Sequence, residues 1–314
     1  MVNARRPGLL AYLLVFLLPG PALAWGDTGH RVICEIAFQE LRSIARDRVK
    51  AMIDRDPEFD TFAESCAWPD HPRRRATEHY VNLPRDADGL EEDPCPLATE
   101  CVVSAIEKDL AVLSSPGASE QQRLEALKYL GHWVGDVHQP LHVSFEDDRG
   151  GNEVGITGGL CRWDLHAVWD SCILEHGLPG DPYTLARLLL NDVTDEERAA
   201  WQGSSPIDWA NEAFAISVSP EVQYCVRTNA GCWYGPNSEG LDQGEPERTV
   251  TIDRSYIEAA GARRQEPAAE GRWPIGRSAG PSARGLIKRA ECKAGALPDR
   301  GLSPGGAAGR QAFQ

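Results

Sequence analysis

The sequence predicts an all-α fold, a single mainly helical domain cross-linked by disulfide bonds. Apolar residues recur at helical spacing through most of the chain, and few runs show the alternation with period two that indicates a strand. Nine cysteines are typical of a protein that folds in an oxidising compartment. Nothing repeats at the period of a solenoid, and the 290 residues after residue 24 fit one large domain, which we prefer to two small ones.

The first 24 residues have the pattern of a secretory signal peptide. Arg5 and Arg6 form a basic start, residues 9–18 form an apolar run, and residues 22–24 (ALA) form a cleavage site of small residues. The apolar run is too short to span a bilayer well, and no later stretch approaches the length that a membrane span needs. We therefore expect a secreted or periplasmic protein without a membrane anchor, whose mature chain begins at Trp25.

Residues 25–41 have an apolar face at helical spacing, and Asp27 or Thr28 can cap this helix. Residues 54–101 are rich in proline and read as loops. Residues 160–174 carry a further apolar stripe at helical spacing. Other helices are expected at residues 102–113, 124–137, 183–190, 196–201, 207–218 and 250–260.

Eight of the cysteines can be arranged in pairs. Three pairs are close in sequence, and a fourth could join the first helix to the loop at Asp70: Cys95 with Cys101, Cys161 with Cys172, Cys225 with Cys232, and Cys34 with Cys66. Cys292 is the odd one out. Eight cysteines allow 105 connectivities, so other pairings stay open.

The composition changes near residue 262. Residues 263–314 contain ten Arg or Lys against four Asp or Glu, with many Gly, Pro and Ala and almost no periodic apolar residues. A segment of this kind buries too little apolar surface to fold. We expect residues 25–262 to form the domain and residues 263–314 to be a disordered or irregular tail.

Charge and metal-binding residue types give the first indication of function. A formal net charge of −15 argues against a nucleic-acid-binding surface built from lysine and arginine, so a polyanionic substrate would require bound metal. His132 and Asp136 share a helical face, Pro140 ends that helix, and His142 follows. A His and an Asp four residues apart are most often an ordinary surface pair. Whether this pair binds metal therefore depends on how many further donor residues the chain contains.

Those donors occur in five motifs along the chain, WGDTGH, SCAWPDHPR, EHYVNLP, GHWVGDVHQPLH and DLHAVWD, and a sixth motif, DRGGN, contains Asn152. The series resembles the zinc-dependent single-strand-specific nucleases of fungal type and the plant bifunctional nucleases, which are distantly related to bacterial zinc phospholipases C. The resemblance implies their all-α fold with a trinuclear metal site. It assigns one Zn²⁺ to Asp70, His79, His132 and Asp136, and a second to His142, His166 and Asp170. A third would be bound by the amine and carbonyl of Trp25, by His30 and by the bridging Asp136.

The resemblance also implies a reaction. The expected reaction is the hydrolysis of phosphodiester bonds in single-stranded DNA and RNA, which gives 5′-phosphate products. The same enzymes also act as 3′-nucleotidases. The active form would be a monomer whose three Zn²⁺ activate water. Asp70, Arg73 and Asp136 would be catalytic, and Arg73 would stabilise the charged phosphate. Asn82 and Asn152 match positions that contact the base. The histidines that match no ligand position are His71, His138 and His176.

Two alternatives remain open at the level of the sequence. A zinc phospholipase C would use the same ions on a lipid phosphodiester, but those enzymes carry Glu where this chain has Asp170, and no amphipathic membrane-docking stretch is evident. A secreted zinc-binding protein without catalysis would have the same donors in closed sites, and its metal-loaded form would never cleave nucleic acid.

Overall fold

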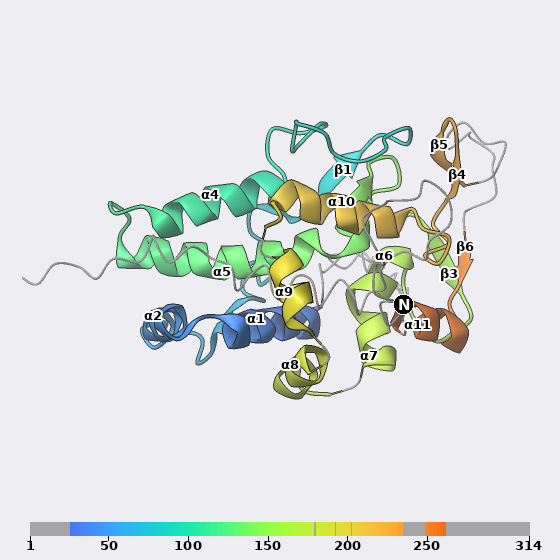
Figure 1. Cartoon of the computed structure of the whole chain (residues 1–314). Helices are drawn as coiled ribbons and strands as arrows, with labels where there is room; N and C mark the ends of the chain where they lie inside the picture. Colours follow the sequence, from blue (N-terminus) through green and yellow to red (C-terminus); the bar gives the residue numbers. More distant parts are fainter. Residues whose placement is uncertain (1–25, 179, 192, 202, 235–248, 262–314) are drawn as a thin grey trace, which may run out of the picture.

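The structure, a computed structural model, describes residues 26–178, 180–191, 193–201, 203–234 and 249–261. Most of the described chain is helical and packs around helix α5 (Figure 1). The α-helices are α1 (Asp27–Glu40), α2 (Ser43–Ile53), α3 (Phe62–Ser65), α4 (Val102–Ser114), α5 (Glu120–Val137), α6 (Leu165–Ala167), α7 (Ile173–Gly177), α8 (Pro182–Leu190), α9 (Asp195–Trp201), α10 (Pro206–Ser217) and α11 (Arg254–Gly261). Three short helices are 3₁₀ or π in type: η1 (Ala76–His79), η2 (Pro140–His142) and η3 (Val168–Cys172).

Helix α5 is central because its second half is apolar or closely packed on every side. Every residue from position 130 to the end of the helix is buried, including Trp133. Helix α4 runs beside α5, α10 packs on one side and α1 on the other (Figure 1). A helix that is buried all round belongs to the interior of a domain, and any polar residue on it must find partners there.

In the part of the chain that the structure describes, six short strands form three two-stranded sheets. They are β1 (Val81–Leu83) with β2 (Val143–Phe145), β3 (Gly155–Thr157) with β6 (Thr249–Thr251), and β4 (Val226–Thr228) with β5 (Gly231–Trp233). Strands β1 and β2 are parallel, with Val81 opposite Val143. Because η1 ends at His79 and η2 ends at His142, this register brings both histidines to the same end of the sheet.

All four expected disulfide pairings are confirmed: Cys34–Cys66, Cys95–Cys101, Cys161–Cys172 and Cys225–Cys232. The first joins α1 to the end of α3 directly against α5. A Cβ atom on Gly131 of α5 would lie 2.5 Å from the sulfur of Cys66, so only glycine allows this approach. Cys292 lies outside the described residues.

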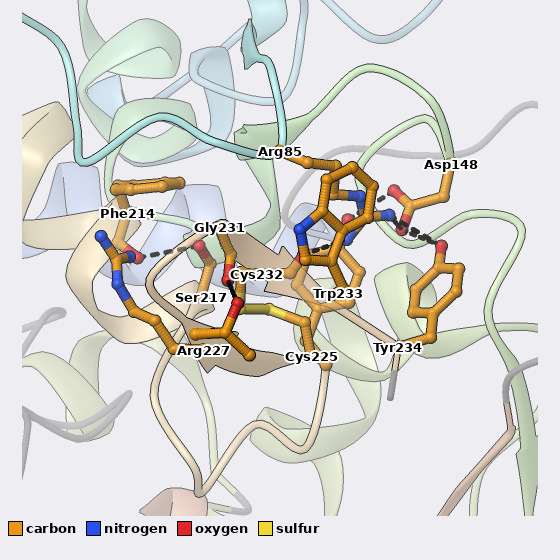
Figure 2. The surroundings of a disulfide bond; sticks show 12 residues. Arg85, Asp148, Phe214, Ser217, Cys225, Arg227, Gly231, Cys232, Trp233 and Tyr234 are labelled. Atoms are coloured by element: carbon orange, nitrogen blue, oxygen red, sulfur yellow. Dashed lines mark hydrogen bonds and ion pairs between the residues drawn. A yellow bond between two sulfur atoms is a disulfide. The ribbon is translucent and has the colours of Figure 1, made fainter. Parts of the chain in front are cut away.

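The β4–β5 hairpin is fixed to the rest of the fold by a buried arginine (Figure 2). Arg85 donates to Asp148 at 2.6 Å and to the hydroxyl of Tyr234 at 2.8 Å, and its guanidinium lies 4.3 Å from the centre of the Phe145 ring. Asp148 also accepts from the backbone N–H of Gly151 at 2.9 Å. The hairpin therefore supports the turn at residues 148–151, which approaches the candidate metal centre.

Several local expectations were wrong. Residues 250–260 are not one helix: β-branched Thr249–Thr251 pair as a strand, and Asp253 then accepts from the N–H of Tyr256 to begin α11. The N-cap of α1 is Gly26, with no capping side chain from Asp27 or Thr28. The helical part of residues 160–174 begins only at Leu165 and runs through α6, η3 and α7, and α2 was not expected. Among the described helices, none has the length and apolar character to cross a membrane. The tail at residues 263–314 lies outside the described residues.

Candidate metal centre

Eight histidine and aspartate side chains from separate elements converge beside the last turns of α5. None of the eight is more than 7% exposed. α1 supplies His30, the loop after α3 supplies Asp70, and η1 supplies His79. The remaining donors are His132 and Asp136 of α5, His142 of η2, His166 of α6 and Asp170 of η3.

Asp136 lies at the centre of the set. Its Oδ2 is 3.1 Å from Nδ1 of His79 and 3.1 Å from Nε2 of His132. Its Oδ1 is 3.2 Å from Nδ1 of His142 and 3.5 Å from Nε2 of His30. The two oxygens of one carboxylate therefore face different histidines, which is the geometry that a bridging ligand requires.

The donors form three groups whose ligand atoms lie within 4.8 Å of one another: Asp70 with His79 and His132, His30 with His132 and Asp136, and His142 with His166 and Asp170. Each group combines imidazole nitrogen with carboxylate oxygen, a donor set that suits Zn²⁺. His132 contributes to two groups because its ring lies 3.8 Å from that of His30 in a stacked arrangement.

Backbone carbonyls orient three of the histidines. Nδ1 of His132 lies 2.7 Å from the carbonyl of Cys66, Nε2 of His79 lies 2.9 Å from that of Arg74, and Nδ1 of His166 lies 2.7 Å from that of Gly150. A nitrogen that donates to a carbonyl leaves the other ring nitrogen as an acceptor. In each case that second nitrogen faces the aspartates, as a metal ligand requires.

Several buried polar atoms of the cluster have no hydrogen-bond partner among the described residues. They are both ring nitrogens of His30, Oδ1 of Asp70, both carboxylate oxygens of Asp136 and Nδ1 of His142. Burying such atoms without a partner costs free energy, and a bound cation would offset that cost. The residues present therefore fit a multinuclear metal site.

The electrostatics of His30 and Asp136 agree with this fit. Burial lowers the pKa of His30 well below its usual value, and the neighbouring His132 lowers it further. Burial would raise the pKa of Asp136, but His132 and His142 hold it well below its usual value. A neutral histidine and an ionised aspartate are the forms that bind a metal ion. Asp170 differs, because burial raises its pKa well above its usual value and favours the neutral acid, so a metal ion would have to displace a proton there.

Arg73 lies close enough to the cluster for its charge to act on it. Burial, His142 and Arg73 together lower the pKa of His166 to about 3. Trp25 lies outside the described residues, but the N–H of the next residue, Gly26, donates to the carbonyl of Asp170 at 2.8 Å. The start of α1 is thereby fixed at the edge of the cluster.

The two asparagines expected to contact the nucleotide base are close to the proposed ligands in sequence and are partly exposed. Asn82 is in β1, opposite Ser144 of β2, and Asn152 donates to the carbonyl of Arg149 at 2.7 Å. No contact of either with a donor residue is seen among the described residues, so their assignment to the base stays a prediction.

The three histidines placed outside the ligand set belong to none of the three donor groups. His138 is buried, with Nδ1 2.7 Å from the carbonyl of Val134, and His176 is exposed. His71 is half exposed, and its Nε2 lies 2.7 Å from Asp27 at the start of α1.

Sequence reasoning missed two residues that shape the cluster. Gln139 donates to Oδ1 of Asp170 at 2.5 Å while its own carbonyl oxygen accepts from the N–H of Leu141, so it orients an aspartate. Gly135 allows His30 to approach α5, because a Cβ atom there would lie 2.7 Å from Nδ1 of His30. The glycines four residues apart in GHWVGD were the available signal for the close approach of α1.

Comparisons with known proteins agree with the donor arrangement. The family model for S1/P1 nuclease matches residues 25–261. Endonuclease 4 of Arabidopsis thaliana is 28% identical over 250 residues, which cover 74% of this chain and 83% of that protein. Endonuclease 3 of the same plant is 30% identical over 244 residues, covering 73% and 81%. Nuclease S1 of Aspergillus oryzae is 26% identical over 196 residues, covering 60% and 67%. This chain belongs to the S1/P1 nuclease family and is a nuclease.

Proposed function

We propose that the protein is an exported, monomeric endonuclease that binds three Zn²⁺ and hydrolyses single-stranded DNA and RNA, and that it also removes phosphate from 3′-nucleotides. The observation that carries the proposal is the convergence of eight buried donors in three groups around Asp136. Three divalent ions would bring more positive charge than the three aspartates bring negative charge. A polyanion could then bind to a protein whose net charge is −15.

The ions would be held by the ligand sets that the family pattern assigns. Asp70, His79, His132 and Asp136 would bind the first, and the second would be bound by the group of His142, His166 and Asp170. When bound, zinc supplies Lewis acidity and lowers the pKa of a coordinated water towards neutrality. Asp136 joins the first group to the site of His30, because its two oxygens face different histidines.

Arg73 would act on the phosphate. Its positive charge contributes to the lowered pKa of His166, so it would also favour a negatively charged phosphodiester at the ions. Charge-assisted hydrogen bonds from arginine strengthen as negative charge develops on the phosphate oxygens. Attack of water at phosphorus with breakage of the bond to the 3′ oxygen leaves a free 3′ hydroxyl on one product and a 5′ phosphate on the other.

The burial of the donors supports a preference for single strands. A phosphate must reach atoms whose residues are at most 7% exposed, and a flexible strand can deform to do so more easily than a stacked duplex. Asn82 and Asn152, both partly exposed, are the residues that we propose to contact the base. Amide side chains offer both donors and acceptors, which suits contact with bases of more than one kind.

The third ion links activity to removal of the signal peptide. If the chain is cut after Ala24, Trp25 acquires a free α-amine, whose pKa near neutrality allows it to bind a metal ion. The hydrogen bond from Gly26 to the carbonyl of Asp170, at 2.8 Å, fixes the adjacent residue beside the other ligands. Uncut precursor would lack this donor.

The proposal is tested with zinc-loaded protein that begins at Trp25, assayed on denatured DNA, RNA and duplex DNA of equal length. We expect cleavage of both single-stranded substrates, slower cleavage of duplex, and products that carry a 5′ phosphate and a free 3′ hydroxyl. A companion protein with one extra alanine before Trp25 should keep its fold by circular dichroism and lose most of its activity. Products with a 3′ phosphate, or full activity of the extended protein, would contradict the mechanism.

A further inference from the structure

The loop at residues 68–79 carries two of the proposed ligands, one near each end. Asp70 and His79 belong to the same donor group, together with His132. Apart from the short helix η1, the loop is irregular, and its two prolines, Pro69 and Pro72, cannot donate backbone hydrogen bonds. His79 is the last residue of η1, but Asp70 lies outside any helix or strand, so turns and side-chain contacts must fix its position.

The side chain of Arg74 holds the first half of this loop. Its Nη1 lies 2.5 Å from the carbonyl oxygen of Trp68, 2.9 Å from that of His71 and 3.0 Å from that of Pro72. These three carbonyls lie on both sides of Asp70 in the chain. Because Nη1 carries two hydrogens, at least one is shared between two acceptors. The guanidinium also lies 4.0 Å from the centre of the Trp68 ring, which fixes its plane.

The backbone of Arg74 holds the other ligand. Its carbonyl accepts from Nε2 of His79 at 2.9 Å, which leaves Nδ1 of His79 facing Asp136 at 3.1 Å and Asp70 at 3.6 Å. Its N–H donates to the carbonyl of Pro69 at 2.7 Å. One residue thus contacts both the backbone around Asp70 and the ring of His79.

We propose that Arg74 is a positioning residue that sets the affinity of the metal ion held by Asp70, His79 and His132. The inference rests on the proposed function, because it assumes that this donor group binds the ion. Arg74 acts through carbonyl groups rather than on the substrate, whereas its neighbour Arg73 acts on the phosphate. All three carbonyl contacts come from Nη1, while the planar guanidinium lies over the ring of Trp68, and the ammonium of lysine cannot reproduce that planar stacking.

A second arginine offers a matched control. Arg46 of α2 donates to the carbonyls of Phe38 at 3.1 Å, Gln39 at 2.5 Å and Leu41 at 2.8 Å, and lies 6.0 Å from the centre of the Phe38 ring. Arg46 therefore holds the turn between α1 and α2 as Arg74 holds the loop at residues 68–79. The carbonyls that it holds belong to residues 38–41, which flank no donor residue, whereas those held by Arg74 lie on both sides of Asp70. Loss of Arg46 should cost stability without changing the metal centre.

The experiment compares Arg74→Ala, Arg74→Lys and Arg46→Ala in full-length processed protein that begins at Trp25. Zinc affinity is measured by competition with a chromogenic chelator, and thermal stability is measured on the same samples. For Arg74→Ala we expect the affinity of one of the ions to fall by roughly 10–100-fold while the others bind as in the unchanged protein. Arg74→Lys should show a smaller loss at the same ion. Arg46→Ala should melt at a lower temperature with all zinc affinities unchanged.

Two outcomes would overturn the inference. One is normal affinity for every ion in Arg74→Lys and in any Arg74→Ala that folds, and the other is an equal loss of affinity in Arg46→Ala. A parallel Asp70→Ala variant separates this failure from failure of the proposed function. If Asp70→Ala loses an ion and Arg74→Ala does not, only the positioning role is wrong. If Asp70→Ala also binds every ion normally, the ligand assignment itself is wrong.

Discussion

The two ends of helix α5 are stabilised in different ways. Its N-terminus has a complete capping box, in which the Ser119 hydroxyl accepts from the N–H of Gln122 at 3.2 Å and the Gln122 side chain accepts from the N–H of Ser119 at 2.9 Å. Its first turns leave Gln121 and Gln122 exposed. Its C-terminal half is wholly buried and includes His132 and Asp136. The first end is stabilised by local bonds, and the second depends on residues distant in the sequence.

At its buried end, α5 has polar residues at positions where apolar residues would pack more stably. A buried helix end made only for packing would carry apolar residues, as Trp133 and Val137 do. Here the carboxylate of Asp136 is buried with no hydrogen-bond partner among the described residues, an arrangement that is costly without a bound cation. Substitutions at the buried end should therefore change metal binding and activity, and substitutions at the capped end should change stability alone.

Asp136→Ala should have the largest effect. Because its two oxygens face different histidines, its loss should remove two of the three zinc ions and lower activity by more than about 100-fold. Zinc content by atomic emission, measured beside the rate of cleavage of denatured DNA, provides the test. His138→Ala is the control, since His138 is a buried histidine at the same helix end and should keep all three ions. Loss of a single ion from Asp136→Ala would argue against bridging.

Gly135→Ala should have an intermediate effect. It should weaken the site, although helix propensity alone predicts that alanine stabilises the helix. Alanine in place of glycine would by itself favour a helix by about 1 kcal/mol. The added Cβ, however, would lie 2.7 Å from Nδ1 of the buried His30, so the ring must move away from its ligand position. We expect zinc affinity to fall by roughly tenfold or more. Gly117→Ala is the control, because its nearest neighbour would be 3.9 Å away. Unchanged zinc affinity in Gly135→Ala would mean that His30 is not held by this contact.

Ser119→Ala should have the smallest effect. Removing the hydroxyl leaves the N–H of Gln122 without its capping partner, and such losses cost about 1 kcal/mol of folding free energy. Urea denaturation of the zinc-loaded protein should show this decrease. Zinc content and turnover should match those of the unchanged protein. A fall in either would contradict the claim that the capped end of α5 affects stability alone.

The sequence was most informative where the pattern is local. Helical periodicity located α4, α5 and α8 closely, and short spacings between cysteines favoured three of the disulfide pairs that the structure contains. The donor residues were recognised through their motifs, and the structure brings the eight that it describes together. Their roles as ligands stay predictions until metal is measured.

Other features depend on tertiary contacts that no local pattern encodes. The parallel pairing of β1 with β2 joins residues 62 positions apart, and each strand has only three residues. Gln139 was passed over because its importance lies in a bond to Asp170, which is 31 positions away in sequence. Arg74 was hidden between Arg73 and Arg75 in a run that resembles an ordinary basic surface. In each case the long-range partner, rather than the residue type, defines the role.

The zinc content of the processed, metal-saturated protein is the most direct test of the central claim. The account predicts three ions per chain when the protein begins at Trp25, with one ion lost when an extra residue blocks the α-amine. Fewer than three ions in correctly processed, folded protein, or no difference between the two N-termini, would contradict it.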